Sequence, residues 1–199
     1  MWETRTPLLL VRHGETSWNA EGRWQGHADP ELTPRGRAQA DELARALAAE
    51  QGSPWTRIIA SDLARARQTA EIVADLLSLP LELDPRLREL DVGAWSGLSR
   101  EEIERIDAET LRAFERGEPT IRPGGGESRL EIRERTHAFV SDLTKHRAGD
   151  GVILVTHLGV IRALLPGASP THAEKIEALA EEIAARPIDR HRRPEDGVL

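Results

Sequence analysis

Short apolar runs alternate along the chain with longer segments in which apolar residues follow helical spacing. Residues 7–11 are apolar throughout, as is typical of a strand buried on both faces of a parallel sheet. Residues 57–61 and 151–156 are strand-like runs with apolar centres, and residues 81–83 form a shorter run. We therefore predict four strands joined by long connections.

The segments between these runs carry the start and stop signals of helices. Thr33 precedes Pro34, a pair that suits the N-cap and first position of a helix, and Gly52 is a natural end for it. Residues 63–77 place apolar side chains on one helical face. A short helix is predicted over residues 160–165, and capping boxes start two further helices, at Ser99 with Glu102 and at Ser128 with Glu131.

Strands that alternate with helices of this length predict an α/β fold. We expect a mostly parallel central sheet with helices on both faces, a three-layer α/β/α arrangement. The 199 residues suit one domain with a sizeable core, and no repeat, low-complexity tract or linker divides them. The prediction is a single domain over residues 1–199.

Composition narrows the class of protein. The formal net charge is −7. Because a nucleic-acid-binding surface needs a basic face, this charge argues against a nucleic-acid-binding protein. The sequence has no cysteine, which excludes disulfides and thiolate metal sites. The first residues lack the pattern of a signal peptide, and no apolar run approaches the ~20 residues that span a bilayer. We therefore expect a cytoplasmic protein that binds neither nucleic acid nor membranes.

Polar side chains follow three of the predicted strands. Arg12 and His13 come directly after the first strand, and His157 comes directly after the strand that ends at residue 156. Arg65 follows shortly after the second strand. Because ligands gather beyond the carboxyl ends of strands in open α/β sheets, we expect these side chains to meet at one edge.

Two arginines and two histidines at one site suit phosphoryl transfer. Guanidinium groups donate forked hydrogen bonds that match phosphate oxygens. An unprotonated imidazole is a competent nucleophile toward phosphorus, and neighbouring arginines disfavour its protonation. The second imidazole can donate to the phosphoryl oxygens, so the transferring group is stabilised without a metal ion. We expect neither a metal nor a cofactor.

A departing alkoxide also needs an acid. The loop at residues 88–95 offers two carboxyl groups, Glu89 and Asp91. A bound phosphate dianion disfavours the ionised form of a nearby carboxyl, so substrate binding itself can prepare the acid. Spacing alone does not choose between the two residues.

Five segments in order carry a further signal. They are R-H-G-E-T at residues 12–16 followed by Trp18 and Asn19, G-H-A-D with L-T-P-R-G at 26–29 and 32–36, S-D-L-A-R-A-R-Q-T-A at 61–70, E-L-D-V-G-A-W-S-G at 89–97, and V-T-H-L-G-V-I-R at 155–162. Together they resemble the motifs of the histidine phosphatase superfamily, also called phosphoglycerate mutase-like. The resemblance extends over most of the chain and implies the phosphoglycerate mutase-like fold.

The resemblance also implies a role for each matching residue. His13 would be the nucleophile that becomes phosphorylated, and Glu89 would be the general acid. Arg12, Arg65 and His157 would hold the phosphoryl group. Further substrate contacts are implied at Asn19 and near Gln25 and Gly26.

Phosphatase and phosphoglycerate mutase are the main alternatives within this family. Mutases of this type resemble longer chains, with an added segment after the acid loop, whereas only residues 99–123 separate that loop from the glycine-rich turn here. We therefore expect a phosphomonoester hydrolase that acts on a small phosphorylated metabolite through a phosphohistidine. A cofactor-dependent phosphoglycerate mutase is the alternative, and a catalytically silent phospho-ligand-binding or regulatory domain is the second.

The C-terminal part departs from the family pattern, in which a further helix and one or two strands complete the sheet. From about residue 166 we expect an atypical tail, with a capped helix from Thr171 to about Ala185, no strand, and a loose polar end at residues 187–194. A sheet edge left uncovered in this way would open a route to a homodimer. His27 is expected at the pocket rim or on the surface, and the other histidines are expected to be structural or exposed, namely His137, His146, His172 and His191.

Overall fold

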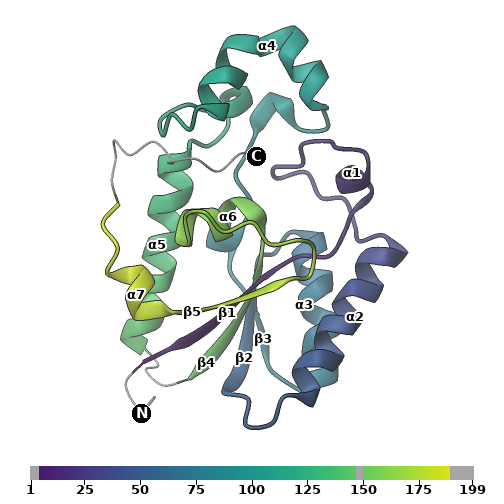
Figure 1. Ribbon diagram of the computed structural model, residues 1–199, viewed down its shortest axis with the longest axis vertical. Coiled ribbons are helices and arrows are strands. Elements are labelled where there is room, and N and C mark those ends of the chain that lie inside the picture. The colour runs from purple at the N-terminus through teal and green to yellow at the C-terminus, as the bar shows by residue number, and fades with distance from the viewer. Residues whose placement is uncertain (1–4, 147–149, 189–199) are drawn as a thin grey trace.

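A five-stranded sheet forms the middle of the molecule (Figure 1). The structure is a computed structural model and describes residues 5–146 and 150–188. The strands are β1 (Pro7–Arg12), β2 (Trp55–Ala60), β3 (Leu81–Leu83), β4 (Gly151–Thr156) and β5 (Lys175–Leu179). Their order in the sheet is β3-β2-β4-β1-β5, with β5 antiparallel to β1 and every other pair parallel.

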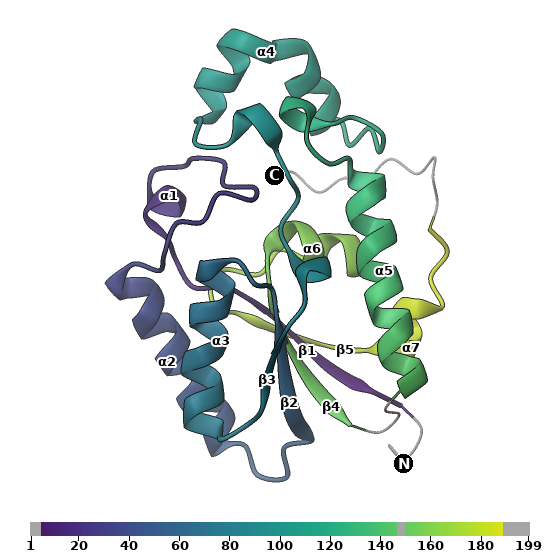
Figure 2. The same cartoon turned by 180° about the vertical axis from the view of Figure 1, so that it is seen from behind.

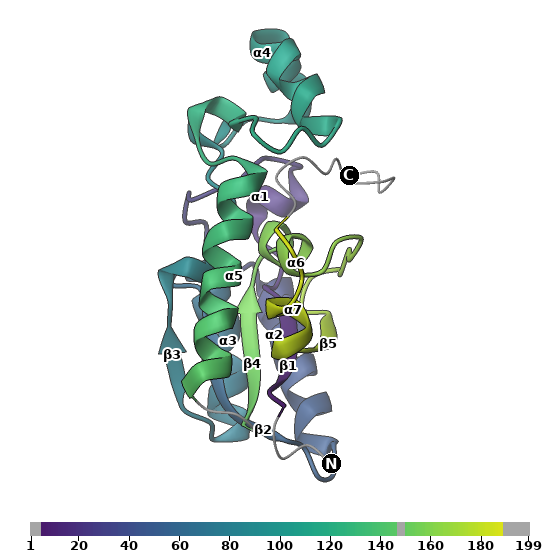
Figure 3. The same ribbon diagram turned by 90° about the vertical axis from the view of Figure 1, so that its left-hand side faces the viewer.

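Helices cover both faces of this sheet (Figures 1 and 2). One face is covered by α2 (Pro34–Ala49) and α3 (Ala64–Leu77), and the other by α5 (Arg129–His146), α6 (Leu158–Leu164) and α7 (Ala180–Ala184). The short α1 (Ser17–Ala20) and the longer α4 (Arg100–Glu115) lie beyond the carboxyl end of the sheet (Figure 3). Single 3₁₀ turns occur at Pro85–Leu87, Gly93–Trp95 and Pro123–Gly125.

The side chains of β1 show how the sequence produces these layers. Leu8 and Leu10 pack into the core beneath α5, whereas Leu9 and Val11 pack beneath α2 and α3, and all four are fully buried. Successive side chains of a strand point to opposite faces, so an apolar run without alternation is buried only when both faces are covered. The predicted three-layer α/β/α fold with a mostly parallel sheet is confirmed.

The helix and strand bounds predicted from local sequence signals mostly agree with the observed bounds. Thr33 accepts a hydrogen bond from the Gly36 amide at the start of α2, and Ser99 forms the predicted capping box with Glu102. The strand predicted at residues 57–61 runs from Trp55 to Ala60, a shift of one or two residues. No helix among the described residues is long and apolar enough to cross a membrane.

The predicted helix from Thr171 to about Ala185 is wrong. The expected cap is formed only in part: the Thr171 amide and hydroxyl both donate to Glu174 Oε2, at 2.6 and 3.0 Å, whereas the Glu174 amide donates to the Thr171 carbonyl oxygen and not to its side chain. However, Ala173 has a φ of +55°, a left-handed conformation that does not continue a helix. The chain instead forms β5 along the free edge of β1, and only α7 is helical.

This strand also changes the expectation for the sheet edge. β5 covers β1, so the predicted absence of a strand and the uncovered β1 edge are both wrong. The proposed route to a homodimer loses that premise, and a homodimer stays a prediction. The end of the tail that we expected to be loose lies outside the described residues from position 189 onward.

Candidate active site

His13 begins the site directly after β1, with only 3% of the residue exposed. Its Nδ1 lies 2.7 Å from the carbonyl oxygen of Gly14. A carbonyl oxygen only accepts, so Nδ1 carries the hydrogen and Nε2 keeps a free lone pair. Burial, followed by the charge of Arg65, lowers the pKa of His13 well below 6.5, although the bond to Gly14 acts the other way. His13 is therefore a neutral imidazole whose Nε2 is unprotonated.

The turn after His13 depends on a close approach of two backbones. A Cβ atom on Gly14 would lie 2.4 Å from the carbonyl oxygen of Gly36 at the start of α2. The Gly14 amide donates to Thr69 Oγ1 of α3 at 3.0 Å. Glycine is thus required here for space, and both helices of this face hold the turn that presents His13.

His157 follows β4 and lies opposite His13, with the ring centroids 5.1 Å apart. It is fully buried, and its Nε2 lies 2.8 Å from the hydroxyl oxygen of Ser61. Burial, and then the charge of Arg65, lowers the pKa of His157 well below 6.5. The two strand ends that we expected to meet do bring the two imidazoles together.

Arg65 is a fully buried guanidinium at the start of α3. Nη1 donates to the carbonyl oxygen of Ala28 at 2.7 Å, and Nη2 donates to that of Gly26 at 2.8 Å. Burial lowers the pKa of Arg65 to about 10, so the side chain stays cationic at neutral pH. Neutral carbonyls orient this cation, and the charges of Glu89 and Asp29 offset part of the effect of burial on its pKa.

Arg12, the last residue of β1, supplies a second cation. Its Nη1 donates to the carbonyl oxygen of Pro170 at 3.0 Å. Burial lowers its pKa, while the charge of Glu89 acts in the opposite direction. The charges of Arg65 and Arg12 add to the burial that lowers the pKa of His13.

Glu89 is the carboxyl group that faces these arginines. Burial lowers the pKa of both Arg12 and Arg65, and the charge of Glu89 opposes that shift at each. Oε1 accepts from the Leu90 amide at 2.8 Å, and Oε2 accepts from the Gly159 amide at 3.3 Å.

Asp91, the other candidate acid, makes a local contact instead. Its Oδ1 accepts from the Gly93 amide at 2.9 Å within its own turn. Of the two carboxyls that spacing left open, Glu89 is the one whose charge acts on Arg12 and Arg65, and its role as the general acid stays a prediction.

The predicted substrate contacts at the mouth of the site have structural partners of their own. Asn19 Oδ1 accepts from the amide and the hydroxyl of Thr16, as the last member of a capping box for α1. Gln25 Oε1 also accepts from that hydroxyl at 2.9 Å, and the carbonyl of Gly26 receives Arg65. Gly26 thus positions Arg65, and direct substrate contact by Asn19, Gln25 and Gly26 stays a prediction.

His172 is a residue of the site that the sequence did not identify. Its ring centroid lies 5.9 Å from that of His13. Nothing in the local sequence marks it, because its position depends on the pairing of β5 with β1. His27 lies at the acid loop, with Nε2 2.8 Å from the carbonyl oxygen of Glu89. His137 is buried on α5 as a structural residue, and the side chains of His146 and His191 lie outside the described part of the chain.

Several buried nitrogens around His13 lack a hydrogen-bond partner among the described residues. They are Arg12 Nε, Arg65 Nε, His157 Nδ1 and His172 Nε2. A buried donor without an acceptor costs about 1–3 kcal/mol, so a cluster of them is costly unless a ligand supplies acceptors. A tetrahedral oxyanion offers several acceptor oxygens and a charge opposite to that of the two arginines. No group of three metal-ligating side chains occurs in the described part of the chain.

Comparisons with known proteins find similar sequences and similar solved structures. Phosphoglycerate mutase-like protein 4 of Arabidopsis thaliana is 39% identical over 174 residues, which are 86% of this chain and 74% of the relative. The probable phosphoglycerate mutase GpmB of Escherichia fergusonii is 40% identical over 171 residues, 84% of this chain and 78% of the relative. The structure of a mycobacterial glucosyl-3-phosphoglycerate phosphatase in complex with VO3 superposes with a TM-score of 0.77 at 34% identity, covering 86% of this chain and 92% of the other. A family model described as the histidine phosphatase superfamily (branch 1) matches residues 8–190, and the chain belongs to that family.

Proposed function

We propose that this protein is a phosphomonoester hydrolase that acts through a phosphohistidine on a small phosphorylated metabolite. The observation that carries the proposal is the state of His13, a neutral imidazole with an unprotonated Nε2 beside two cationic guanidiniums. A nucleophile must keep its lone pair, and a phosphate dianion requires positive charge. Both conditions are met at one point of the structure.

In the first step, His13 Nε2 attacks the phosphorus atom, and the bond from phosphorus to the ester oxygen breaks. Arg12, Arg65 and His157 are proposed to hold the phosphoryl oxygens as charge redistributes over them. Glu89 gives its proton to the departing alkoxide, because a bound dianion favours the protonated form of that carboxyl. The products are an alcohol and a phosphohistidine.

In the second step, water replaces His13 on phosphorus. Glu89, now a carboxylate, takes a proton from the attacking water, and the bond between phosphorus and Nε2 breaks. Inorganic phosphate leaves, while His13 regains its lone pair and Glu89 its proton. The step needs no metal ion, since the guanidiniums balance the charge of the phosphoryl group.

The comparisons bear on the choice between hydrolysis and mutase activity. The structural neighbour named as a glucosyl-3-phosphoglycerate phosphatase matches at a TM-score of 0.77 and supports a hydrolase. The sequence relatives named as phosphoglycerate mutases, at 39% and 40% identity, favour the second candidate, a cofactor-dependent mutase. The two differ in the acceptor of the phosphoryl group, which is water in one case and a second hydroxyl in the other.

Substitution of the nucleophile tests the proposal. With an aryl phosphate, His13→Ala is expected to lower kcat by more than about a thousandfold, because no other group replaces the attacking nitrogen. Labelled substrate should leave an acid-labile, base-stable label on the wild type and none on the variant. His137→Gln, which changes a buried histidine of α5 far along the chain from the site, should keep both activity and label.

Two further outcomes separate the alternatives. Interconversion of phosphoglycerates that depends on a bisphosphate primer, without release of inorganic phosphate, would establish the mutase instead. Wild-type turnover that persists in His13→Ala would rule out the phosphohistidine route. A wild type that binds phosphate but turns over neither kind of substrate would leave only a silent binding domain.

A further inference from the structure

The turn that precedes β5 is attached to the main chain of the site itself. The Ala173 amide donates to the carbonyl oxygen of Arg12 at 2.9 Å and lies 3.3 Å from that of His13. On the same edge of β1, the Arg12 amide donates to the carbonyl oxygen of Glu174. His172 is therefore fixed beside His13 by backbone hydrogen bonds along the edge of β1 that pairs with β5.

The His172 ring has a nitrogen that the fold leaves unused. Nε2 is buried and has no hydrogen-bond partner among the described residues. Burial, and then the charge of Arg12, lowers the pKa of His172 to about 4, so the ring is neutral at physiological pH. A neutral imidazole carries its one hydrogen on either ring nitrogen, and a buried polar nitrogen without a partner is unfavourable, so Nε2 can carry the hydrogen when an acceptor is offered to it.

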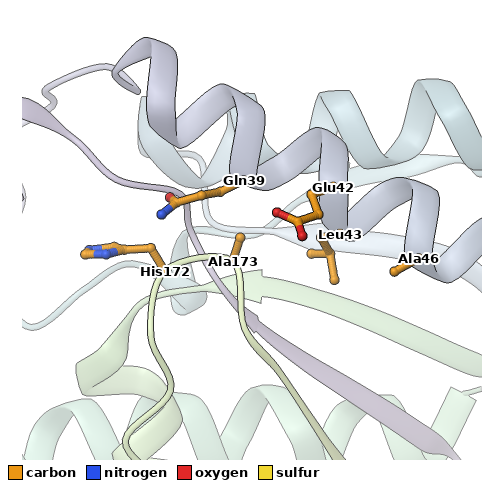
Figure 4. Close-up of a pocket in the computed structure, with 6 residues that line it drawn as sticks. All are labelled: Gln39, Glu42, Leu43, Ala46, His172 and Ala173. Atoms are coloured by element: carbon orange, nitrogen blue, oxygen red, sulfur yellow. The ribbon is translucent and has the colours of Figure 1, made fainter.

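A neighbouring pocket does not account for this ring. A pocket of ≈ 230 Å³ lies between α2 and the turn, lined by Gln39, Glu42, Leu43, Ala46, His172 and Ala173. Figure 4 shows the His172 ring turned away from the Glu42 and Ala46 end of that pocket, with its nitrogens at the far side. The side chain thus borders the pocket without filling it, and its distance of 5.9 Å from the His13 ring relates it to the site.

We infer that His172 Nε2 donates a hydrogen bond to an oxygen of the phosphoryl group while that group is bound at His13. This inference rests on the proposed function. Reacting atoms stand about 3–3.5 Å apart before attack, so a phosphorus atom in front of His13 brings its oxygens between the two rings. The bond would satisfy the orphaned nitrogen and add a third imidazole to the phosphoryl site.

The chemistry of a neutral donor suits this position. Arg12 and Arg65 already supply two positive charges, enough to balance a phosphate dianion. A third cation would disfavour the release of inorganic phosphate, whereas a neutral N–H group adds a directed bond without adding charge. His172 would therefore orient the phosphoryl group and leave the charge balance of the site unchanged.

Two substitutions separate this role from a structural one. His172→Leu removes the donor and keeps an apolar side chain of similar extent, whereas His172→Gln keeps an N–H donor at similar reach. We expect His172→Leu to weaken binding of orthovanadate and of inorganic phosphate, measured by calorimetry at pH 7, about 10- to 100-fold. His172→Gln should stay within about threefold of the wild type, and kcat/KM for an aryl phosphate should follow the same order.

A matched control and a measurement on the wild type complete the test. His137→Leu removes another buried histidine and should leave anion affinity unchanged. In the wild type, titration with inorganic phosphate should shift the ring N–H signal of His172 in long-range proton–nitrogen spectra, a readout that does not depend on the folding of any variant. The signal is assigned by its disappearance in His172→Gln.

The outcomes distinguish the inference from the function on which it rests. Unchanged affinity in His172→Leu, equal loss in His172→Leu and His172→Gln, or a ring signal that phosphate does not move would each overturn the inference. Failure of every ester to react, together with phosphate binding that depends on His172, would instead overturn the hydrolase and leave the contact intact.

Discussion

At the scale of single residues, the role of a side chain depends on three-dimensional contacts that cannot be read from the spacing of residues along the sequence. Arg12, His13, Arg65 and His157 could be predicted as a group, because each lies at or shortly after the end of a strand that is visible in the sequence. Glu89 and Asp91 are two positions apart in one loop, yet only Glu89 acts on the charges of Arg12 and Arg65. His172 could not be predicted at all, because a long-range strand pairing brings it to the site.

Gly159 is a residue whose missing side chain positions the acid. A Cβ atom there would lie 2.1 Å from Glu89 Oε1, so Gly159→Ala must displace the carboxyl. We predict a fall in kcat of at least about tenfold for an alkyl phosphate, since general acid catalysis is worth roughly 10²–10⁴-fold. For an aryl phosphate the fall should be smaller, because a good leaving group needs less protonation. The measurement is the fall in kcat caused by Gly159→Ala on the alkyl phosphate, compared with its fall on the aryl phosphate.

Gly52→Ala provides the control for this prediction. No neighbouring heavy atom lies within 4 Å of the position of its Cβ, but its φ is +71°. The substitution should lower stability by about 1 kcal/mol and leave both kcat values unchanged. Equal rates for Gly159→Ala and the wild type on alkyl phosphates would show that Glu89 is not the proton donor.

At the scale of elements, local signals and tertiary pairing compete at the C-terminus. Strands β1, β2 and β4 are nearly continuous apolar runs, so their burial on both faces is visible in the sequence. β5 reads K-I-E-A-L, which is also compatible with a helix, and it follows a capping-box pair. This segment becomes a strand because it pairs with the free edge of β1, which lies more than 160 residues earlier in the chain. A local stretch of sequence carries no information about that pairing.

The backbone of β5 offers a matched pair of substitutions. The Arg12 amide donates to the carbonyl oxygen of Glu174, and the Ala180 amide donates to that of Thr6. The backbone N–H and C=O groups of the even-numbered residues of β5 therefore point toward β1. Ala178→Pro removes a ladder bond and should lower the free energy of unfolding by about 1–3 kcal/mol. Glu177→Pro, whose amide faces away from β1, should cost much less. Urea denaturation of both variants measures the difference.

Activity provides a second readout for the same pair. Ala178→Pro loosens the strand that carries the His172 turn, so it should also lower kcat/KM, whereas Glu177→Pro should not. Equal stability of the two variants would mean that β5 is not held along β1 in solution.

At the scale of the whole molecule, the buried histidines connect the site to the stability of the fold. His13 and His157 are 3% and 0% exposed, and burial lowers the pKa of both well below 6.5. The folded protein therefore keeps them neutral in a pH range where the unfolded chain binds protons. Stability rises with pH wherever the unfolded state binds more protons, so this contribution is complete above about pH 6.5 and is lost as the pH falls.

We predict that the free energy of unfolding of this protein decreases steadily from pH 7 to pH 5. Each fully buried histidine contributes a slope of up to about 1.4 kcal/mol per pH unit below pH 6.5. Ion-paired carboxyls such as Asp62, whose pKa is lowered by the hydrogen bond from Arg88, add a loss of the same sign only below about pH 4, outside this window. Urea denaturation at several pH values gives the slope of the free energy of unfolding against pH. In His157→Asn this slope should be smaller by the contribution of one buried histidine. A wild-type slope near zero between pH 6.5 and 5 would mean that the site holds its imidazoles charged, which is incompatible with His13 as the nucleophile.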